Sequence, residues 1–348
     1  MADTGAAIFD IATLNDLLRA AREGFAEVLG ALVERPLLVV DLDTAGELDG
    51  IEVRALLPSV IVGVSRTGVA PGPLDGVDVA LTGVADSAAP WVSVTDLDAG
   101  LDEIASAVSA SPVASVTLAQ VLRSGRSDSL DHDVLLESLA YSMLQGGTEF
   151  RRWLEGRPPR LARPDPENRV IVDRFEDRLS ITLNRPRVRN AYDAAMRDQL
   201  CEALWMVGAD PSITQVDLRG SGPDFCSGGD LNEFGTATDP VRSHLIRTSR
   251  SAARLLAAVG DRVTAHLHGA CIGAGIELPA AAGRVIAEPD TRVQLPEVAM
   301  GLIPGAGGTA TLARRIGRQR TAWLALTGQA IDARTALAWN LVDEVNRP

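Results

Sequence analysis

The chain has 348 residues, of which 46% are hydrophobic and 23% charged, and its net charge is −13. This length favours two domains over one, and the composition is ordinary for a water-soluble globular protein. Three widely spaced cysteines exclude a disulfide framework, no apolar run reaches eighteen residues, and the first residues lack the basic region of a secretory signal. We therefore expect a cytoplasmic protein with no membrane partner.

The charge is concentrated in the first part of the chain. Residues 1–130 hold 19 acidic residues and 7 arginines, whereas residues 131–348 hold 27 acidic residues and 26 arginines. The acidic part argues against nucleic acid as a partner. Arginine is the only strongly basic residue type, so any mechanism that needs a lysine base or a lysine Schiff base is excluded.

The first half predicts alternating helices and strands. An amphipathic helix is expected at 14–33, and buried strands are expected at 36–43, 59–65, 77–82 and 91–94. Helices are expected at 97–110 and 112–123, and one long helix at 131–154. This order indicates an α/β domain, and we find no catalytic constellation in it.

Two further segments of the first half have plain interpretations. Asp41, Asp43, Glu47 and Asp49 cluster at a strand end, where a solvated acidic turn is favoured over a cation site. Residues 157–167 contain four prolines, the composition of a stiff linker. We therefore predict an N-terminal domain over 1–166 and a second domain over 167–348.

The second half begins with two strands in 170–183 around the turn Glu176-Asp177. A helix at 193–208 and a strand at 215–219 follow, and a small-residue loop over 220–234 runs into a further helix. Residues 242–259 predict one partly solvated helix that carries Arg247, Arg250 and Arg254. His266 and His268 lie on one face of a strand, where hydrogen bonding is favoured over metal binding.

The stretch 263–308 combines glycine turns with two carboxylates. A strand at 263–267 enters a glycine turn, and a helix at 276–282 carries Glu277 in its first turn. A strand at 284–288 leads to Glu297, and the glycine cluster 303–308 opens a helix near Thr309. Two carboxylates beside glycine-rich backbone suit acid–base chemistry next to an oxyanion or a phosphate.

Five ordered segments resemble the crotonase (enoyl-CoA hydratase/isomerase) superfamily over about 170–345. They are LNRPRVRNAY (183–192), DFCSGGDL (224–231), HGACIGAGIEL (268–278), LPEVAMGLIPGAGGTATLAR (295–314) and GQAIDARTALAWNLVDEV (328–345). The resemblance implies an α/β fold built as a spiral of ββα turns, and an acyl-coenzyme A (CoA) thioester as substrate.

The resemblance also implies a catalytic site. The amides of Gly229 and Ala274 would hold the thioester oxygen as it becomes an oxyanion, which is one of the strongest ways in which an enzyme stabilises a transition state. Glu277 and Glu297 would orient a water and manage its protons, with Gly305 beside them. CoA contacts are implied at Ser227, Asp230 and Leu231, and phosphate contacts at Arg187 or Arg189, because Asn232 stands where the family often has lysine.

The implied reaction is hydration of an α,β-unsaturated acyl-CoA to a 3-hydroxyacyl-CoA, with no metal and no cofactor beyond the CoA of the substrate. The alternatives are an enoyl-CoA isomerase, a thioester hydrolase or an oxygenase of the same family, and a non-catalytic scaffold subunit. Retention of both glutamates favours the hydratase.

Family members usually continue with a C-terminal helical region that covers the acyl pocket and builds a trimer, whereas here about 166 residues precede the resemblance. We expect the N-terminal domain to supply that cover or the contacts of a homo-oligomer, a trimer or hexamer. A sharper hypothesis is that this domain is a degenerate crotonase copy, which predicts ββα turns within 1–160.

Overall fold

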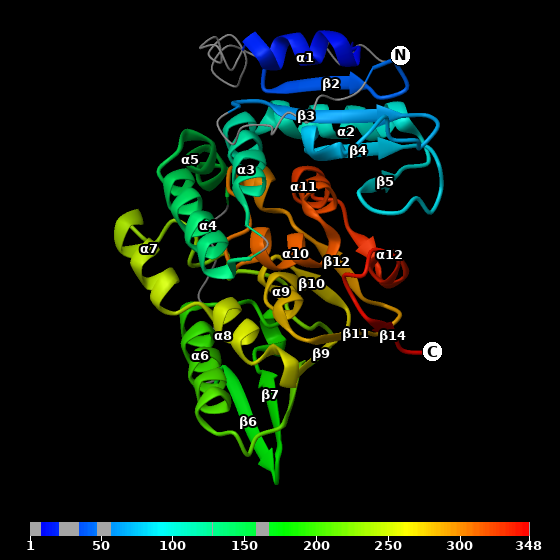
Figure 1. Cartoon of the computed structure of the whole chain (residues 1–348). Coiled ribbons are helices and arrows are strands. Elements are labelled where there is room, and N and C mark those ends of the chain that lie inside the picture. The colour runs from blue at the N-terminus through cyan, green and yellow to red at the C-terminus, as the bar shows by residue number, and fades with distance from the viewer. Residues whose placement is uncertain (1–7, 21–34, 47–56, 127, 158–166, 348) are drawn as a thin grey trace.

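The computed structural model describes residues 8–20, 35–46, 57–126, 128–157 and 167–347. Figure 1 shows the N-terminal sheet at one end of the molecule and the hairpin β6–β7 at the other. The helices α3 to α5 and α10 lie between these two ends.

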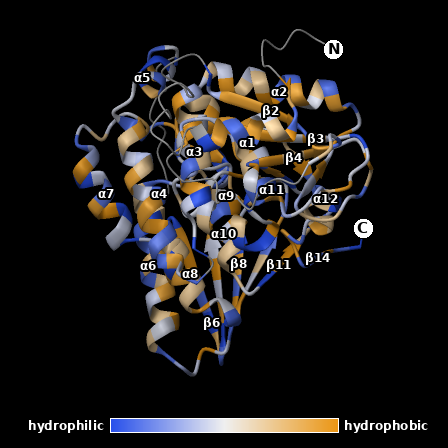
Figure 2. Cartoon of the chain, turned by 45° about the horizontal axis from the view of Figure 1, so that its top comes forward, coloured by the Kyte–Doolittle hydropathy of each residue, from blue (hydrophilic) through white to orange (hydrophobic). Residues whose placement is uncertain are grey.

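The N-terminal sheet is fully parallel, and its strands follow one another in chain order. Its strands are β1 (Ile8–Phe9), β2 (Leu37–Asp41), β3 (Val60–Ser65), β4 (Val79–Thr82) and β5 (Trp91–Ser93). The four strands predicted from the sequence are confirmed. They are continuous apolar runs because both faces of a parallel sheet are covered, and Figure 2 shows their mostly hydrophobic colouring.

The helices of this half flank the sheet and then leave it. Helix α1 (Ile11–Ala20) buries Ile11, Leu14 and Leu18, and residues 21–33 of the predicted helix lie outside the described residues. Helices α2 (Leu97–Ala110) and α3 (Pro112–Ser124) are confirmed. Among the described residues no single helix is long and apolar enough to cross a membrane, and only α2 with α3 pass together, bent by 108°.

The single long helix predicted over 131–154 is wrong. The chain forms α4 (Leu130–Gln145) and α5 (Thr148–Glu155), which are separated by Gly146 and Gly147. The amides of these glycines donate to the carbonyls of Met143 and Leu144, at 3.1 and 2.8 Å, and close the last turn of α4. Glycine is a poor helix former, because it loses more backbone conformational freedom in a helix than other residues do, so a pair of glycines favours a helix end.

The second half has two sheets. The larger sheet contains the antiparallel hairpin β6 (Val170–Phe175) and β7 (Arg178–Leu183), followed by the parallel strands β8 (Gln215–Gly220), β9 (Val263–Leu267), β11 (Arg284–Ala287) and β14 (Glu344–Val345). The smaller sheet contains β10 (Ala270–Ile272), β12 (Arg292–Gln294) and β13 (Ile331–Asp332). The order β9, β10, α9 is the ββα turn that the resemblance implied.

The helices of the second half cover these sheets. They are α6 (Ala194–Ala209), α7 (Pro240–Ser249), α8 (Ala252–Ala258), α9 (Ala274–Glu277), α10 (Gly308–Ile316), α11 (Arg318–Thr327) and α12 (Ala333–Ala338).

Three helix predictions need correction here. Residues 242–259 belong to α7 and α8, because Ser251 accepts from the amide of Arg254 and starts a new helix. The helix predicted at 276–282 ends at Glu277, since Pro279 begins a separate 3-10 turn. Residues 231–236 form turns instead of the helix expected after the small-residue loop.

One hydrophobic core runs through both halves of the chain, and includes Val39, Leu118, Leu144, Leu218 and Leu278. Helix α4 packs against α7 and α10 of the second half, as Figure 1 shows. The first half therefore lies against the second, and its predicted role as cover or as oligomer contact stays a prediction. The domain boundary itself stays a prediction, because residues 158–166 lie outside the described part.

The degenerate-copy hypothesis gains little from the described residues. The N-terminal strands share parallel pairing in chain order with β7, β8, β9 and β11. Within residues 8–20, 35–46, 57–126 and 128–157, however, there is no antiparallel hairpin and no second small sheet. The ββα turns that the hypothesis predicts are not found there.

Candidate active site

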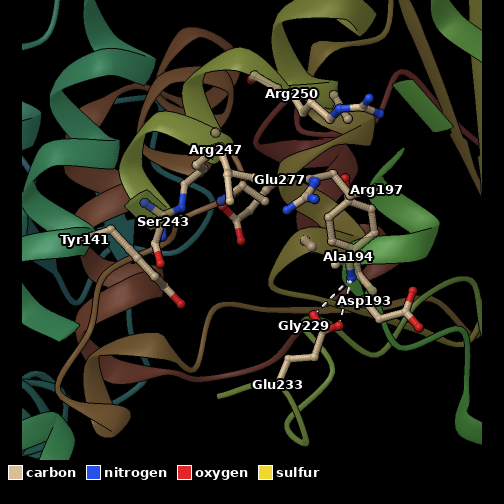
Figure 3. A pocket seen from close by; sticks show the side chains of 18 of the residues that line it. Tyr141, Asp193, Ala194, Arg197, Gly229, Glu233, Ser243, Arg247, Arg250 and Glu277 are labelled. Carbon is tan, nitrogen blue, oxygen red and sulfur yellow. Dashed lines mark hydrogen bonds between the residues drawn. The ribbon is translucent and has the colours of Figure 1, made fainter. Parts of the chain in front are cut away.

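A cavity of about 410 Å³ lies between α4, α7 and the glycine loops of the second half. It brings together all five residues that the resemblance placed at the catalytic centre, although they come from segments up to 76 residues apart. The lining includes Gly229, Ala274, Glu277, Glu297 and Gly305. Figure 3 shows part of this lining, with Glu277 near Tyr141 and Arg247.

The two glycine loops are held side by side by backbone hydrogen bonds. The amide of Cys226 donates to the carbonyl of Ala270, and the amide of Ile272 donates to the carbonyl of Cys226, both at 3.0 Å. This contact leaves Gly229 and Ala274 facing one cavity. Ala274 is the first residue of α9, and neither its N–H nor that of Gly229 donates a hydrogen bond to another described residue, so both amides can donate to a ligand.

Glu277 is fixed by the glycine cluster 303–308 that precedes α10. It ends the short helix α9, which Gly273 starts from a positive φ of 51°, and its side chain is 2% exposed. One carboxylate oxygen, Oε2, accepts from the amides of Ala306 at 2.7 Å and Gly308 at 2.9 Å. Burial disfavours the ionised form of a carboxyl group, and these two hydrogen bonds favour it.

Glu297 is held differently. It follows Pro296 at the start of a 3-10 turn, Glu297–Met300, and is 8% exposed. Its Oε1 lies where a side chain at Gly273 would project, so glycine is required at that position. Its Oε2 is buried and accepts no hydrogen bond from any described residue.

Burial raises the pKa of both glutamates, and repulsion between carboxylates raises it further. For Glu277, the amides of the 303–308 glycine cluster oppose this rise in pKa. Two carboxyl groups that share a dry site lose their protons in separate steps, so one can be acidic while the other is basic.

Of the five residues predicted to contact CoA, one lines the cavity. Asp230 lines the cavity, but its carboxylate accepts from the Arg185 guanidinium at 2.8 Å. Ser227, Leu231, Arg187 and Arg189 do not line it. Arg189 forms an ion pair with Asp224 at 2.7 Å, so its charge is already matched.

The arginines of the cavity were not predicted as site residues. Arg197, Arg247 and Arg250 line it. The prediction of a partly solvated helix is confirmed, because α7 has no buried residue, and the guanidinium of Arg247 lies 4.5 Å from the ring centroid of Tyr141. Burial lowers the pKa of Arg247, and among the described residues no carboxylate lies within ion-pair distance of it.

Two further site residues come from the first half, where the sequence showed no catalytic pattern. Glu137 and Tyr141, one helical turn apart on α4, both line the cavity. The Tyr141 ring lies against Gly305, at a place that a side chain on residue 305 would occupy. The apolar periodicity around 131–154 predicted a helix, but no signal showed what that helix contacts.

The remaining candidates have structural contacts. His266 bonds to Asp217 at 2.6 Å and His268 to the Gly222 carbonyl at 3.0 Å, so hydrogen bonding is confirmed for both. The Asp43 carboxylate accepts from Ser65, Arg66 and Thr67, and Glu47 and Asp49 lie outside the described residues. The described residues contain no group of three side chains suited to a metal ion.

The family model for enoyl-CoA hydratase/isomerase matches residues 177–347. The chain belongs to this family of acyl-CoA enzymes, and the fold class expected for the second half is confirmed. The first half adds an α/β region with a parallel sheet.

Individual relatives include both reaction types of the family. The 2,3-dehydroadipyl-CoA hydratase of Escherichia coli (strain K12) is 35% identical over 51% of this chain and 68% of its own length. The 1,2-epoxyphenylacetyl-CoA isomerase of the same organism is 35% identical over 48% of this chain and 65% of its own length. The crystal structure of an enoyl-CoA hydratase from Thermoplasma volcanium GSS1 covers 51% of this chain and 71% of its own, at 31% identity and a TM-score of 0.47. The similarity thus spans about two thirds of each of these relatives.

Proposed function

We propose that this protein adds water across the double bond of an α,β-unsaturated acyl-CoA. One observation carries the proposal: Glu277 and Glu297, with unlike hydrogen bonding, line one cavity together with the Gly229 and Ala274 amides. A site with only the amides would polarise a thioester, but it would have no paired groups to deliver water.

The amides of Gly229 and Ala274 bind the thioester oxygen and stabilise its negative charge as the enolate forms. Glu277, whose ionised form is favoured by two amide donors, takes a proton from water as its oxygen bonds to the β-carbon. Glu297, whose Oε2 has no donor, carries a proton and gives it to the α-carbon. The elements of one water are thereby added, and the proton taken up by Glu277 returns to Glu297 before the next turnover, so no redox partner is needed.

The acyl group that fits the cavity is open to a direct test. The name of the first relative gives 2,3-dehydroadipyl-CoA, whose acyl chain ends in a carboxylate, as its substrate. Arg247, which lines this cavity, is a half-buried cation without an ion-pair partner among the described residues. We therefore include an acyl chain with a terminal carboxylate beside unsubstituted enoyl-CoAs in the substrate panel.

The first test is Glu297→Gln. Removing the proton donor should lower kcat for hydration by two or more orders of magnitude, while the affinity for a saturated acyl-CoA persists in calorimetry. Because glutamine keeps the volume and the buried position, a general loss of folding is a poor explanation of such a result. Turnover close to that of the wild type would overturn the proposed role of Glu297.

Product analysis separates the alternatives within and outside the enzyme class. A 3-hydroxyacyl-CoA identifies the hydratase, a shifted double bond an isomerase, free CoA a hydrolase, and consumption of O₂ an oxygenase. Acyl-CoA binding without turnover of any enoyl-CoA would favour a scaffold subunit.

A further inference from the structure

The loop that precedes α10 donates hydrogen bonds to two carboxylates from different halves of the chain. Its backbone amides alternate between them: Ala306 and Gly308 donate to Glu277, whereas Gly307 and Thr309 donate to Glu137. This is the segment that fixes the proposed base, Glu277. Its geometry therefore depends on a side chain about 170 residues away in sequence.

Glu137 makes three hydrogen bonds in this contact. It accepts from the amide of Gly307 at 2.7 Å, the amide of Thr309 at 2.8 Å and the hydroxyl of Thr309 at 2.7 Å. The side chain projects from α4 and is 1% exposed. All three donors lie at the first turn of α10, a helix of nine residues, where a negative charge is also favoured by the helix dipole.

The loop has no side chain of its own at the residue before α10 that could accept from these amides. Gly307, the residue before α10, has a positive φ of 109° and no side chain that could cap the helix. A side chain on Gly308 would collide with Glu277, so this position is also fixed by the contact. The amides are accordingly satisfied by carboxylates from outside the loop.

Burying the Glu137 carboxyl group beside two others costs free energy, which indicates a role beyond closing a helix end. Burial raises the pKa of Glu137 to about 8, and the carboxylate of Glu277 contributes to this rise. A serine or threonine at position 307 is the ordinary local solution for a helix end, and it brings no third carboxyl group into a site that already holds two.

We propose that Glu137 is a positioning residue for catalysis: from the N-terminal half, it fixes the 305–309 loop and thereby the carboxylate of Glu277. This inference rests on the proposed function of Glu277. It also gives α4 a role beyond cover, because the site of the second half is complete only with this helix in place.

The test compares Glu137→Gln with Glu149→Gln in the full-length chain. Glu149 is a matched control, because its carboxylate accepts from the amides of Val113 and Ala114, at 2.8 and 2.9 Å, at the start of α3 and does not line the cavity. The glutamine at 137 keeps its size but presents an NH₂ group to an amide donor. We expect kcat for hydration to fall about 10- to 100-fold with KM changed less than about 3-fold, and the control to keep both values.

Amide hydrogen exchange of residues 305–309 gives a readout that does not need turnover. Exchange should accelerate in Glu137→Gln and stay at the wild-type rate in Glu149→Gln. Wild-type exchange in both variants, or equal losses of kcat in both, would overturn the role of Glu137. A wild-type protein that hydrates no enoyl-CoA would instead refute the proposed function, and the exchange experiment would still decide whether Glu137 holds the loop.

Discussion

At the scale of single residues, the site is defined by buried carboxyl groups more than by cations. Glu137, Glu277 and Glu297 are each at least nine-tenths buried and line one cavity. Two of the three were predicted from the sequence, because they stand within glycine motifs that the family shares. Glu137 stands in an ordinary helical pattern, and nothing near it in sequence indicates its partners.

These carboxyl groups predict how stability depends on pH. Burial and repulsion between carboxylates raise the pKa of all three above the ordinary value of 4.5, and that of Glu137 to about 8. Between these values the folded protein holds protons that the unfolded chain releases, so the free energy of unfolding decreases as pH rises. The stabilisation is complete below about pH 4.5 and is lost as pH rises through about 8.

The free energy of unfolding, measured by urea denaturation at several pH values between 5.5 and 8.5, checks the predicted decrease. Glu137→Gln removes one of the three groups, so its stability should vary less steeply with pH than that of the wild type. Identical slopes would show that Glu137 is ionised throughout this range.

At the scale of elements, α4 and α5 each support one loop of the site. Helix α4 holds the 305–309 loop through Glu137, and α5 supports the loop of Gly229 through aromatic packing. Phe234, which follows that loop, lies 5.9 Å from Trp153 and 6.5 Å from Phe150 between ring centroids. Its ring also lies 2.9 Å from the place of a side chain on Gly229.

Phe234→Ala tests this support. Removing the ring leaves the Gly229 loop without its backing, so we expect kcat to fall about 10-fold as the amide becomes less well oriented. Phe175→Ala, at an exposed position of the β6–β7 hairpin, is the matched control and should keep wild-type kinetics. Equal activity of the two variants would show that the loop holds its shape alone.

At the scale of the whole molecule, polar contacts join the two halves beside the shared core. Asp78, next to the N-terminal strand β4, accepts from the Arg123 guanidinium and lies 3.6 Å from Arg318 of α11. Arg320 donates to the carbonyls of Trp91 and Ser87. We expect the halves to unfold together, and a homo-oligomer stays a prediction.

Asp78→Ala tests this connection. It would leave two cations without the carboxylate they share, Arg123 of the first half, with 1% of its side chain exposed, and Arg318 of the second half, which should cost about 3–5 kcal/mol of unfolding free energy. Asp128→Ala, which removes the exposed partner of Arg126, should leave the free energy of unfolding almost unchanged, because water screens this pair. Urea denaturation followed by circular dichroism and by activity should give coincident single transitions. Similar stabilities of the two variants, or separated transitions, would contradict the connection.

The sequence by itself determined the family, most strands, and six residues of the cavity, which are Asp230 and the five predicted at the catalytic centre. These features are recorded locally: buried strands appear as apolar runs, and Gly229, Ala274, Glu277, Glu297 and Gly305 lie in short motifs. The glycine pair at 146–147 was also visible, but the helical periodicity on both sides outweighed it. Arginines close to the motifs were favoured for CoA, whereas those of the cavity come from α6, α7 and the residue after α7.

Only the tertiary structure decided how the first half meets the second. Helix α4 shows the same pattern whichever surface it covers, because periodicity reports that a face is buried and not against what. The hydrogen bond that the Gly307 amide donates to Glu137 joins residues 170 positions apart, and the contact of Tyr141 with Gly305 is similarly distant in sequence. Such contacts follow from the packing of whole elements, so the wall facing the two predicted glutamates could be recognised only in the folded chain.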